Sequence, residues 1–166
     1  ATVTISPTGE VVKRGDSKKS TSFGLGDIAI PLPEKAVKIG DKWSTTEEIR
    51  VRESDGRVKR IKTRLIYQLV NVQTGVATIS VDTEVLTPIN DPKVKSQLVQ
   101  QLTAGEIKFD VDAGRPISRQ IDWDETVVGF NGADSMMKYL ARFTEELLPG
   151  DATANAGPEL TGPKIR

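Results

Sequence analysis

Apolar and polar residues alternate along most of the chain, and a glycine stands where one alternating run ends and the next begins. Alternation with a period of two is typical of β-strands that bury one face. Five junctions end in Gly: Pro7-Thr8-Gly9, Ser54-Asp55-Gly56, Gln73-Thr74-Gly75, Asp112-Ala113-Gly114 and Phe130-Asn131-Gly132. A three-residue hairpin loop ends in a left-handed residue, a conformation that Gly adopts without steric cost. We therefore predict a succession of antiparallel hairpins with three-residue loops.

The loop length decides which residues face each other, and a shift of one residue turns every side chain to the opposite face. The first two long hairpins pair Trp43 with Tyr67, Thr45 with Leu65, Ile49 with Ile61, Tyr67 with Val81, Leu69 with Ile79 and Thr63 with Val85. The later hairpins pair Phe109 with Ile117, Trp123 with Tyr139 and Ile121 with Ala141. Asn131-Gly132 also suits a two-residue turn, so the last register has an alternative. One face stays apolar from strand to strand, which favours a sheet that buries this face.

One segment between Pro92 and Gly105 departs from the alternation. Its apolar residues fall at helical spacing, with Gln and Lys on the other side: Val94, Leu98, Val99 and Leu102. Asn90 or Asp91 can cap the start of a helix here, and Gly105 can end it. We predict a helix over about 93–102. Its apolar side should pack on the sheet against Ile61, Leu65, Tyr67, Val81 and Phe109.

The segment from Ser135 to Leu148 fits two patterns. A helix would align Met136, Leu140, Phe143 and Leu147, whereas a strand would align Met137, Tyr139, Ala141 and Phe143. Its cations, Lys138 and Arg142, precede its acids, Glu145 and Glu146, and this order opposes a helix macrodipole. We therefore favour a strand over a helix.

These elements predict one domain over residues 1–148, followed by a flexible C-terminal tail over 149–166 that contains little apolar surface. The predicted fold is mainly β (α+β). A single curved antiparallel meander sheet of about seven or eight strands forms a half-barrel, and one helix covers its apolar face.

Composition narrows the chemistry that this fold can carry. The 166 residues contain no His and no Cys, and 23 Lys and Arg balance 23 Asp and Glu. These absences exclude disulfides, Ser-His-Asp and Cys-His catalysis, and metal sites built on His or Cys. We expect no cofactor, no metal and no enzymatic activity. No apolar run approaches the ~20 residues that span a bilayer, so we expect no transmembrane segment.

Two groups of side chains are candidate sites. The aromatic residues Trp43, Tyr67, Trp123 and Tyr139 would line an apolar ligand pocket if they project into a concavity. Cross-strand aromatic pairs also stabilise a sheet with no ligand at all. Five cations share the opposite face of the first long hairpin: Arg50, Arg52, Arg60, Lys62 and Arg64. Such a patch suits anionic lipid headgroups or polyanions, but nearby acids favour an ordinary solvated face, and we expect no nucleic-acid partner.

Carboxylates cluster at Asp110 and Asp112 and again at Asp122 and Asp124. Paired carboxylates can perform acid–base catalysis or bind calcium. These acids flank a turn or alternate outward from apolar residues, so we interpret them as exposed strand-face acids.

The stretch from Pro31 to Trp43 contains Gly-Asp-x-Trp at the start of a long strand. Glu106 to Arg115 reads as a strand, a Gly-containing turn and the start of another strand. Over roughly residues 31–130 this pattern resembles that of uncharacterised exported bacterial proteins. The resemblance implies an extracytoplasmic protein and no particular activity. The order of elements is also similar to that of half-barrel lipoprotein carriers, in which a curved sheet wraps helices around an apolar groove.

Three hypotheses follow, and one of them is an enzyme, which would need carboxylates such as Asp110 and Asp122 converging in a cleft. The first is a non-enzymatic extracytoplasmic protein, whether periplasmic, secreted or envelope-associated, that binds an apolar or amphipathic, lipid-like ligand in a groove between sheet and helix. The alternative is a structural or protein-interaction module of a cell-envelope assembly with no small-molecule ligand. The sequence leaves the oligomeric state open.

Overall fold

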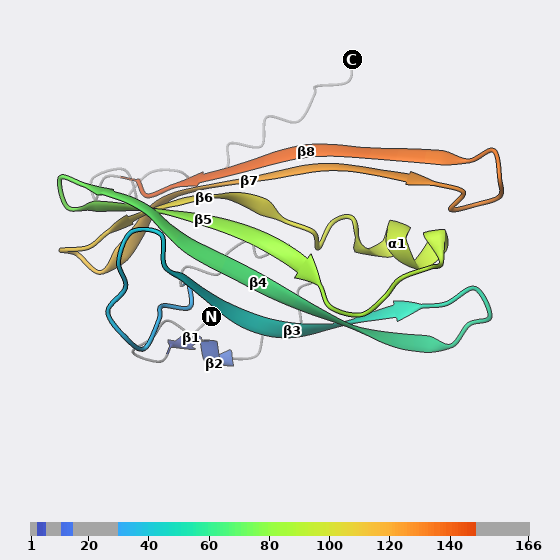
Figure 1. Ribbon diagram of the computed structural model, residues 1–166, viewed down its shortest axis with the longest axis horizontal. Coiled ribbons are helices and arrows are strands. Elements are labelled where there is room, and N and C mark those ends of the chain that lie inside the picture. The colour runs from blue at the N-terminus through green and yellow to red at the C-terminus, as the bar shows by residue number, and fades with distance from the viewer. Residues whose placement is uncertain (1–2, 6–10, 15–29, 149–166) are drawn as a thin grey trace, which may run out of the picture.

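The computed structural model describes residues 3–5, 11–14 and 30–148, and Figure 1 shows their arrangement. The strands are β1 Val3–Ile5, β2 Val11–Arg14, β3 Lys42–Arg52, β4 Val58–Gln73, β5 Val76–Val85, β6 Ala104–Asp110, β7 Arg115–Val128 and β8 Met136–Glu146, and the helix is α1 Pro92–Leu98. The predicted loop at 7–9 and the predicted tail at 149–166 lie wholly or largely outside the described residues.

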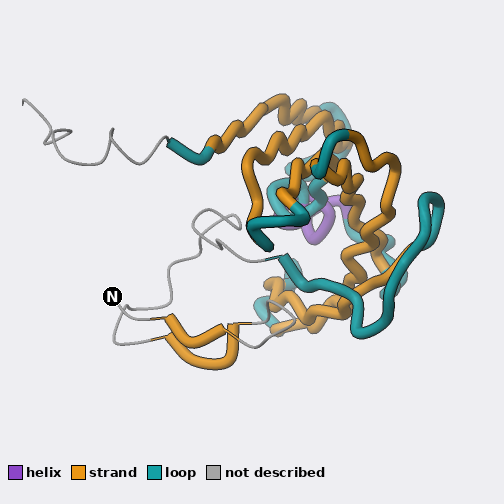
Figure 2. Tube along the Cα trace, turned by 90° about the vertical axis from the view of Figure 1, so that its left-hand side faces the viewer, coloured by secondary structure: helices purple, strands orange, loops and turns teal. Residues whose placement is uncertain are grey.

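The main sheet is the predicted curved antiparallel meander. Its six strands follow chain order, β3-β4-β5-β6-β7-β8, and the sheet does not close on itself. Figure 2 shows the strands curving around α1, with a gap between the two outer strands. Strands β1 and β2 pair antiparallel in a separate sheet. The main sheet therefore has fewer strands than the seven or eight that were predicted.

The first long hairpin has the predicted register. Trp43 pairs with Tyr67 and Ile49 pairs with Ile61. The next hairpin reaches the predicted pairing of Tyr67 with Val81 by a different route. Its turn has two residues in left-handed conformation, Thr74 with φ 52° and Gly75 with φ 77°, which matches the tight hairpin turn of type I′. A bulge between residues 69 and 71 supplies the extra residue that a three-residue loop would have held.

The later registers differ from the prediction. Phe109 pairs with Pro116 and not with Ile117, because the turn is one residue longer and a bulge next to Phe109 absorbs the difference. Trp123 pairs with Ala141, and Ile121 pairs with Phe143. This second shift is two residues, so every side chain keeps its predicted face.

The connection from β7 to β8 explains the two-residue shift. It runs from 129 to 135, and the Ser135 hydroxyl closes it by donating to the Gly132 carbonyl at 2.7 Å and accepting from the Asn131 N–H at 2.8 Å. Beyond this loop the segment is a strand, as favoured. Its half-buried side chains are Met137, Tyr139, Ala141, Phe143 and Glu145, and the residues that alternate with them are exposed.

The helix begins where the sequence indicates but ends early. Asp91 caps it by accepting a hydrogen bond from the Lys93 N–H at 2.8 Å. It ends at Leu98 and not near residue 102, and Gly105 lies inside β6. The carbonyl of Gln100 accepts a hydrogen bond from the Trp123 indole at 3.2 Å, so the chain after Leu98 is held against β7.

The concave face has two hydrophobic clusters. One joins α1 to the sheet through Val51, Ile61, Val94 and Leu98. The larger cluster contains Tyr67, Val81 and Phe109, and it packs against Ile30, Leu32 and Val37. Of the five predicted contacts of the helix, only Ile61 belongs to the cluster with α1. A seven-residue helix is about 10 Å long, whereas β4 extends about 50 Å, so a second segment must cover the rest.

The tight approach of β6 to β7 at Gly105 gives a stability prediction. A Cβ placed on Gly105 would collide with the backbone carbonyl of Gln120, which cannot move without disturbing the sheet. We expect Gly105→Ala to lower the free energy of unfolding by at least about 2 kcal/mol. Urea unfolding followed by circular dichroism measures this change. Gly56→Asn is the control, because Gly56 has open space around it and Asn tolerates a positive φ. Equal losses in the two variants would contradict the prediction.

Candidate functional site

The four predicted aromatic residues belong to a single hydrophobic cluster. Trp43 stacks on Tyr67 with ring centroids 5.7 Å apart, and Trp123 meets Tyr139 edge-on at 6.5 Å. Tyr67 and Trp123 are buried in the larger cluster, and Trp43 and Tyr139 pack against it half-buried. Trp123 and Tyr139 touch diagonally, because Tyr139 pairs with Glu125.

The two indoles fasten the sheet to the segments that cover it. Trp43 Nε1 donates to the Pro31 carbonyl at 2.7 Å, and Trp123 Nε1 donates to the Gln100 carbonyl at 3.2 Å. A buried indole N–H needs such a partner. Alternation along the strands placed these rings on the concave face, but their backbone partners lie in segments that carry no period-two signal.

The basic face of the first hairpin forms as expected. Arg50 and Arg60 lie directly opposite each other on the convex side. Ion pairs neutralise part of this face: Arg60 contacts Glu48 at 3.5 Å and Arg64 contacts Glu84 at 3.1 Å. Arg52 and Lys62 are exposed on the same side. The face is therefore positive but interrupted by acids, which fits a solvated surface.

The candidate carboxylates do not converge. Asp110 and Asp122 lie at opposite ends of the β6–β7 ladder, about 20 Å apart along the strands. Asp110 organises the turn by accepting hydrogen bonds from the backbone N–H groups of Asp112 and Ala113. Asp122 binds the Arg142 guanidinium at 2.5 Å, and this hydrogen bond lowers the pKa of the Asp122 carboxyl. The described residues contain no group of three acids able to hold a metal ion.

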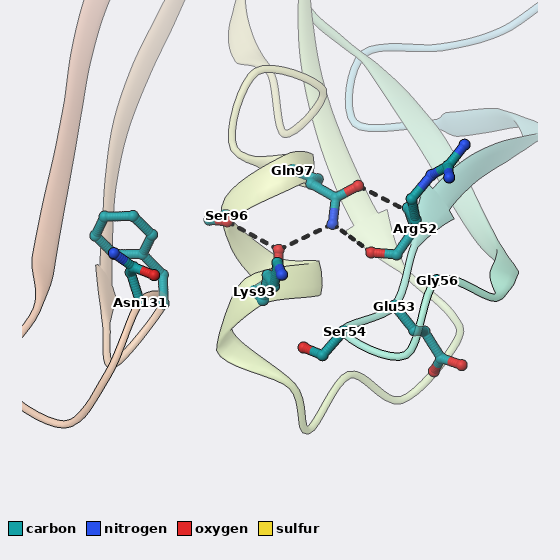
Figure 3. A pocket seen from close by; sticks show the side chains of 9 residues that line it. Arg52, Glu53, Ser54, Gly56, Lys93, Ser96, Gln97 and Asn131 are labelled. Atoms are coloured by element: carbon teal, nitrogen blue, oxygen red, sulfur yellow. Dashed lines mark hydrogen bonds between the residues drawn. The ribbon is translucent and has the colours of Figure 1, made fainter.

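A cavity of about 480 Å³ opens at the end of the half-barrel where α1 lies. Figure 3 shows its three walls: the β3–β4 hairpin, the helix, and the loop between β7 and β8. The lining residues are Arg52, Glu53, Ser54, Gly56, Lys93, Ser96, Gln97, Phe130 and Asn131. None of the four aromatic candidates lines this cavity, and of the basic patch only Arg52 does.

Gln97 holds two of the walls together. Its Oε1 accepts from the Arg52 N–H at 2.9 Å, and its Nε2 donates to the Arg52 carbonyl at 2.7 Å (Figure 3). The same Nε2 donates to the Lys93 carbonyl at 3.1 Å. Ser54 Oγ adds a bond to Asp91 at 3.3 Å. The hairpin end is thus fixed to the helix, so two of the three walls are held together without a ligand.

The third wall supplies an apolar surface and a free amide. Phe130 is half-buried, and Asn131 is exposed beside it with no side-chain hydrogen bond in the described part of the chain. Glu53 is engaged by Arg57 and Lys59, each at 3.7 Å, and its carboxylate points away from Asn131 in Figure 3. The Arg52 guanidinium also points away from Asn131. Lys93, on the helix wall, is the remaining cationic residue of the lining.

The sequence assigned Phe130 and Asn131 to a turn and Gln97 to the polar side of a helix. The one signal that sets them apart is a large aromatic residue in a turn, where small polar residues are usual. Gln97 and Arg52 are 45 residues apart, and no local pattern connects them.

Gln97 gives a test of how the cavity is held. Gln97→Ala removes both bonds to Arg52 and leaves two backbone groups of the hairpin to water. We expect a loss of about 1–2 kcal/mol in the free energy of unfolding, measured by urea titration. Ser96→Ala is the matched control, because Ser96 Oγ bonds only within its own helix, and it should cost less than about 0.5 kcal/mol. A loss in Gln97→Ala no larger than in the control would show that the clamp contributes nothing.

Comparisons with known proteins place the chain in a family. The described residues contain no helix with the length and apolar character of a membrane span. Comparison with curated proteins and with solved structures gives no match. One family model matches residues 10–125, a range that runs from just before β2 to three residues before the end of β7 and includes α1. The match covers more than half of the chain, and the protein therefore belongs to the family of unknown function DUF6263.

Proposed function

We propose that the protein is a non-enzymatic ligand-binding protein whose cavity between α1 and the two hairpins takes up an amphipathic, lipid-like molecule. The cavity of about 480 Å³ carries this proposal. Small-molecule sites have volumes of about 300–1,000 Å³ and join an apolar wall to a few placed polar groups. The bonds of Gln97 to Arg52 support it further, because they hold two of the walls together without a ligand.

The lining indicates the chemistry of the ligand. Phe130 offers the apolar contact, and Asn131 beside it offers an amide that can donate and accept. Lys93 favours a negative head group over a positive one, because Glu53 is already paired and turned away. A single-chain amphiphile with an anionic head suits this arrangement best.

The proposed location is extracytoplasmic, in a bacterial envelope or secreted. The support is the resemblance of the Gly-Asp-x-Trp segment to exported proteins. In this chain the segment forms the turn before β3: Gly40 has φ +94° and donates to the Leu69 carbonyl at 2.7 Å, and Asp41 accepts from the Lys38 N–H at 2.8 Å. Trp43 then lies at the start of β3, where it packs against the larger hydrophobic cluster. In this chain the motif therefore shapes the turn that leads into β3.

The alternative, a protein-interaction module of an envelope assembly, is favoured by a different observation. The outer strand β8 has 11 residues, and no described strand pairs with its free side. Met136 and Leu140 on its convex side are among the most exposed apolar residues, at 69% and 72%. This surface is separate from the cavity, so both functions can coexist.

Binding of three probes with the same chain length tests the cavity. We expect isothermal titration to give one site for dodecanoate, weaker binding of dodecanol, and the weakest binding of dodecylamine. Phe130→Ser should weaken dodecanoate binding about fivefold to tenfold through lost apolar contact. Lys93→Gln should weaken dodecanoate and leave dodecanol unchanged, because only the charged head senses the ammonium group.

Two control variants locate the site. Val72→Ser changes an exposed residue near the opposite end of β4 and should leave binding unchanged. Tyr139→Leu changes the aromatic cluster and should also leave it unchanged. The proposal is wrong if no probe binds, or if Phe130→Ser and Val72→Ser behave alike. Loss of binding in Tyr139→Leu alone would place the ligand at the aromatic residues and away from the cavity.

A further inference from the structure

We propose that β8 is a self-association edge: it pairs antiparallel with β8 of a second copy and joins the two six-stranded sheets into one. The inference concerns a surface outside the cavity and does not depend on the proposed ligand.

The backbone of β8 is suited to pairing. The strand is regular over Met136–Glu146, contains no Pro, and shows no register shift against β7. Natural edge strands are usually protected by shortness, Pro, bulges or a covering segment, because their free N–H and C=O groups accept any extended chain. Within the described residues β8 has none of these protections. Its charged residues are the only feature left to select a partner.

The concave side of β8 is incompletely covered where the sheet stops. The inward residues of β7 are buried, with Trp123 at 5% and Val127 at 2% exposure. The inward residues of β8, including Tyr139 and Phe143, are only half-buried, although they pack against the same cluster. A neighbouring strand would cover their free flank with apolar surface, and this burial favours association.

The charges of β8 select a second copy in antiparallel orientation. On its convex side β8 carries Lys138 near its start and Glu146 at its end, and Arg142, just past the centre, is already bonded to Asp122. Antiparallel pairing brings Lys138 of each strand toward Glu146 of the other, whereas parallel pairing in register sets like against like. Opposite charges across strands stabilise a pair, and like charges destabilise it. The strand is therefore complementary to itself.

A register centred on Ala141 fits the side chains best. The small Ala141 meets its counterpart at the two-fold axis, and Tyr139 faces Phe143 of the partner subunit on the concave side. On the convex side Lys138 lies diagonal to Glu146 of the partner subunit, within reach of these long side chains. Lys138 is only loosely held by Asp124 at 3.6 Å. Glu146 has no ion pair in the described part of the chain.

A charge-swap series tests the proposal on the full chain. We expect sedimentation velocity at increasing concentration to show a reversible dimer. Lys138→Glu and Glu146→Lys should each weaken dimerisation at least fivefold, because each places like charges across the interface. The double variant Lys138→Glu/Glu146→Lys should restore wild-type dimerisation, since it swaps the two charges and keeps their attraction. Lys42→Glu on β3 is the control for a simple change in net charge and should have no effect.

Circular dichroism should first show the same fold in all variants. A wild-type chain that stays monomeric up to millimolar concentration would overturn the proposal. So would a dimer that resists both single reversals, or a double variant that stays monomeric although it folds.

Discussion

The fold depends on one constraint: a single curved sheet has an apolar concave face that must be covered, and the described residues contain one short helix to cover it. The helix reaches only the end of the sheet around Ile61. The other end is closed by the segment with Ile30, Leu32 and Val37. Two separate clusters result, and both indoles of the larger cluster bond to carbonyls of covering segments, Trp43 to Pro31 and Trp123 to Gln100. The cavity lies at the end of the sheet where α1 packs, beyond the reach of both covering segments.

Alternation in the sequence determines the faces of the strands but not always their offset. The pairing of Trp43 with Tyr67 follows directly from the Gly56 turn, because that loop has its expected length. The pairing of Trp123 was wrong by two residues, because residues 129–135 form a loop closed by Ser135 that no period-two pattern reveals. Both results keep every side chain on its expected side. The face of the sheet that a side chain takes is encoded locally, by the alternation along its strand. The length of an irregular loop depends instead on the hydrogen bonds within the loop.

The candidate site was less predictable than the fold for the same reason. The aromatic residues were found because they continue the strand alternation, and the structure gives them core contacts. The cavity is built from a helix and from two hairpin ends that are far apart in the sequence. Its clamp, Gln97 to Arg52, is a polar bridge of a kind that surface composition does not single out. The early end of the helix, held by Trp123 through Gln100, was likewise a tertiary effect that overrode a helical pattern.

The absence of His gives the charge pattern an unusual pH response. No side chain of this sequence has an ordinary pKa near neutrality. Hydrogen bonds from Arg57 lower the pKa of Asp55, and those from Arg142 lower the pKa of Asp122. A depressed folded pKa means that the stabilisation is complete above the unfolded value of 3.8 and is lost as pH falls through the folded value. Asp55 lies in the β3–β4 hairpin and Asp122 ties β7 to β8. Acid therefore weakens an ion pair in the β3–β4 hairpin and one between β7 and β8, while the helix keeps its apolar contacts with Ile61.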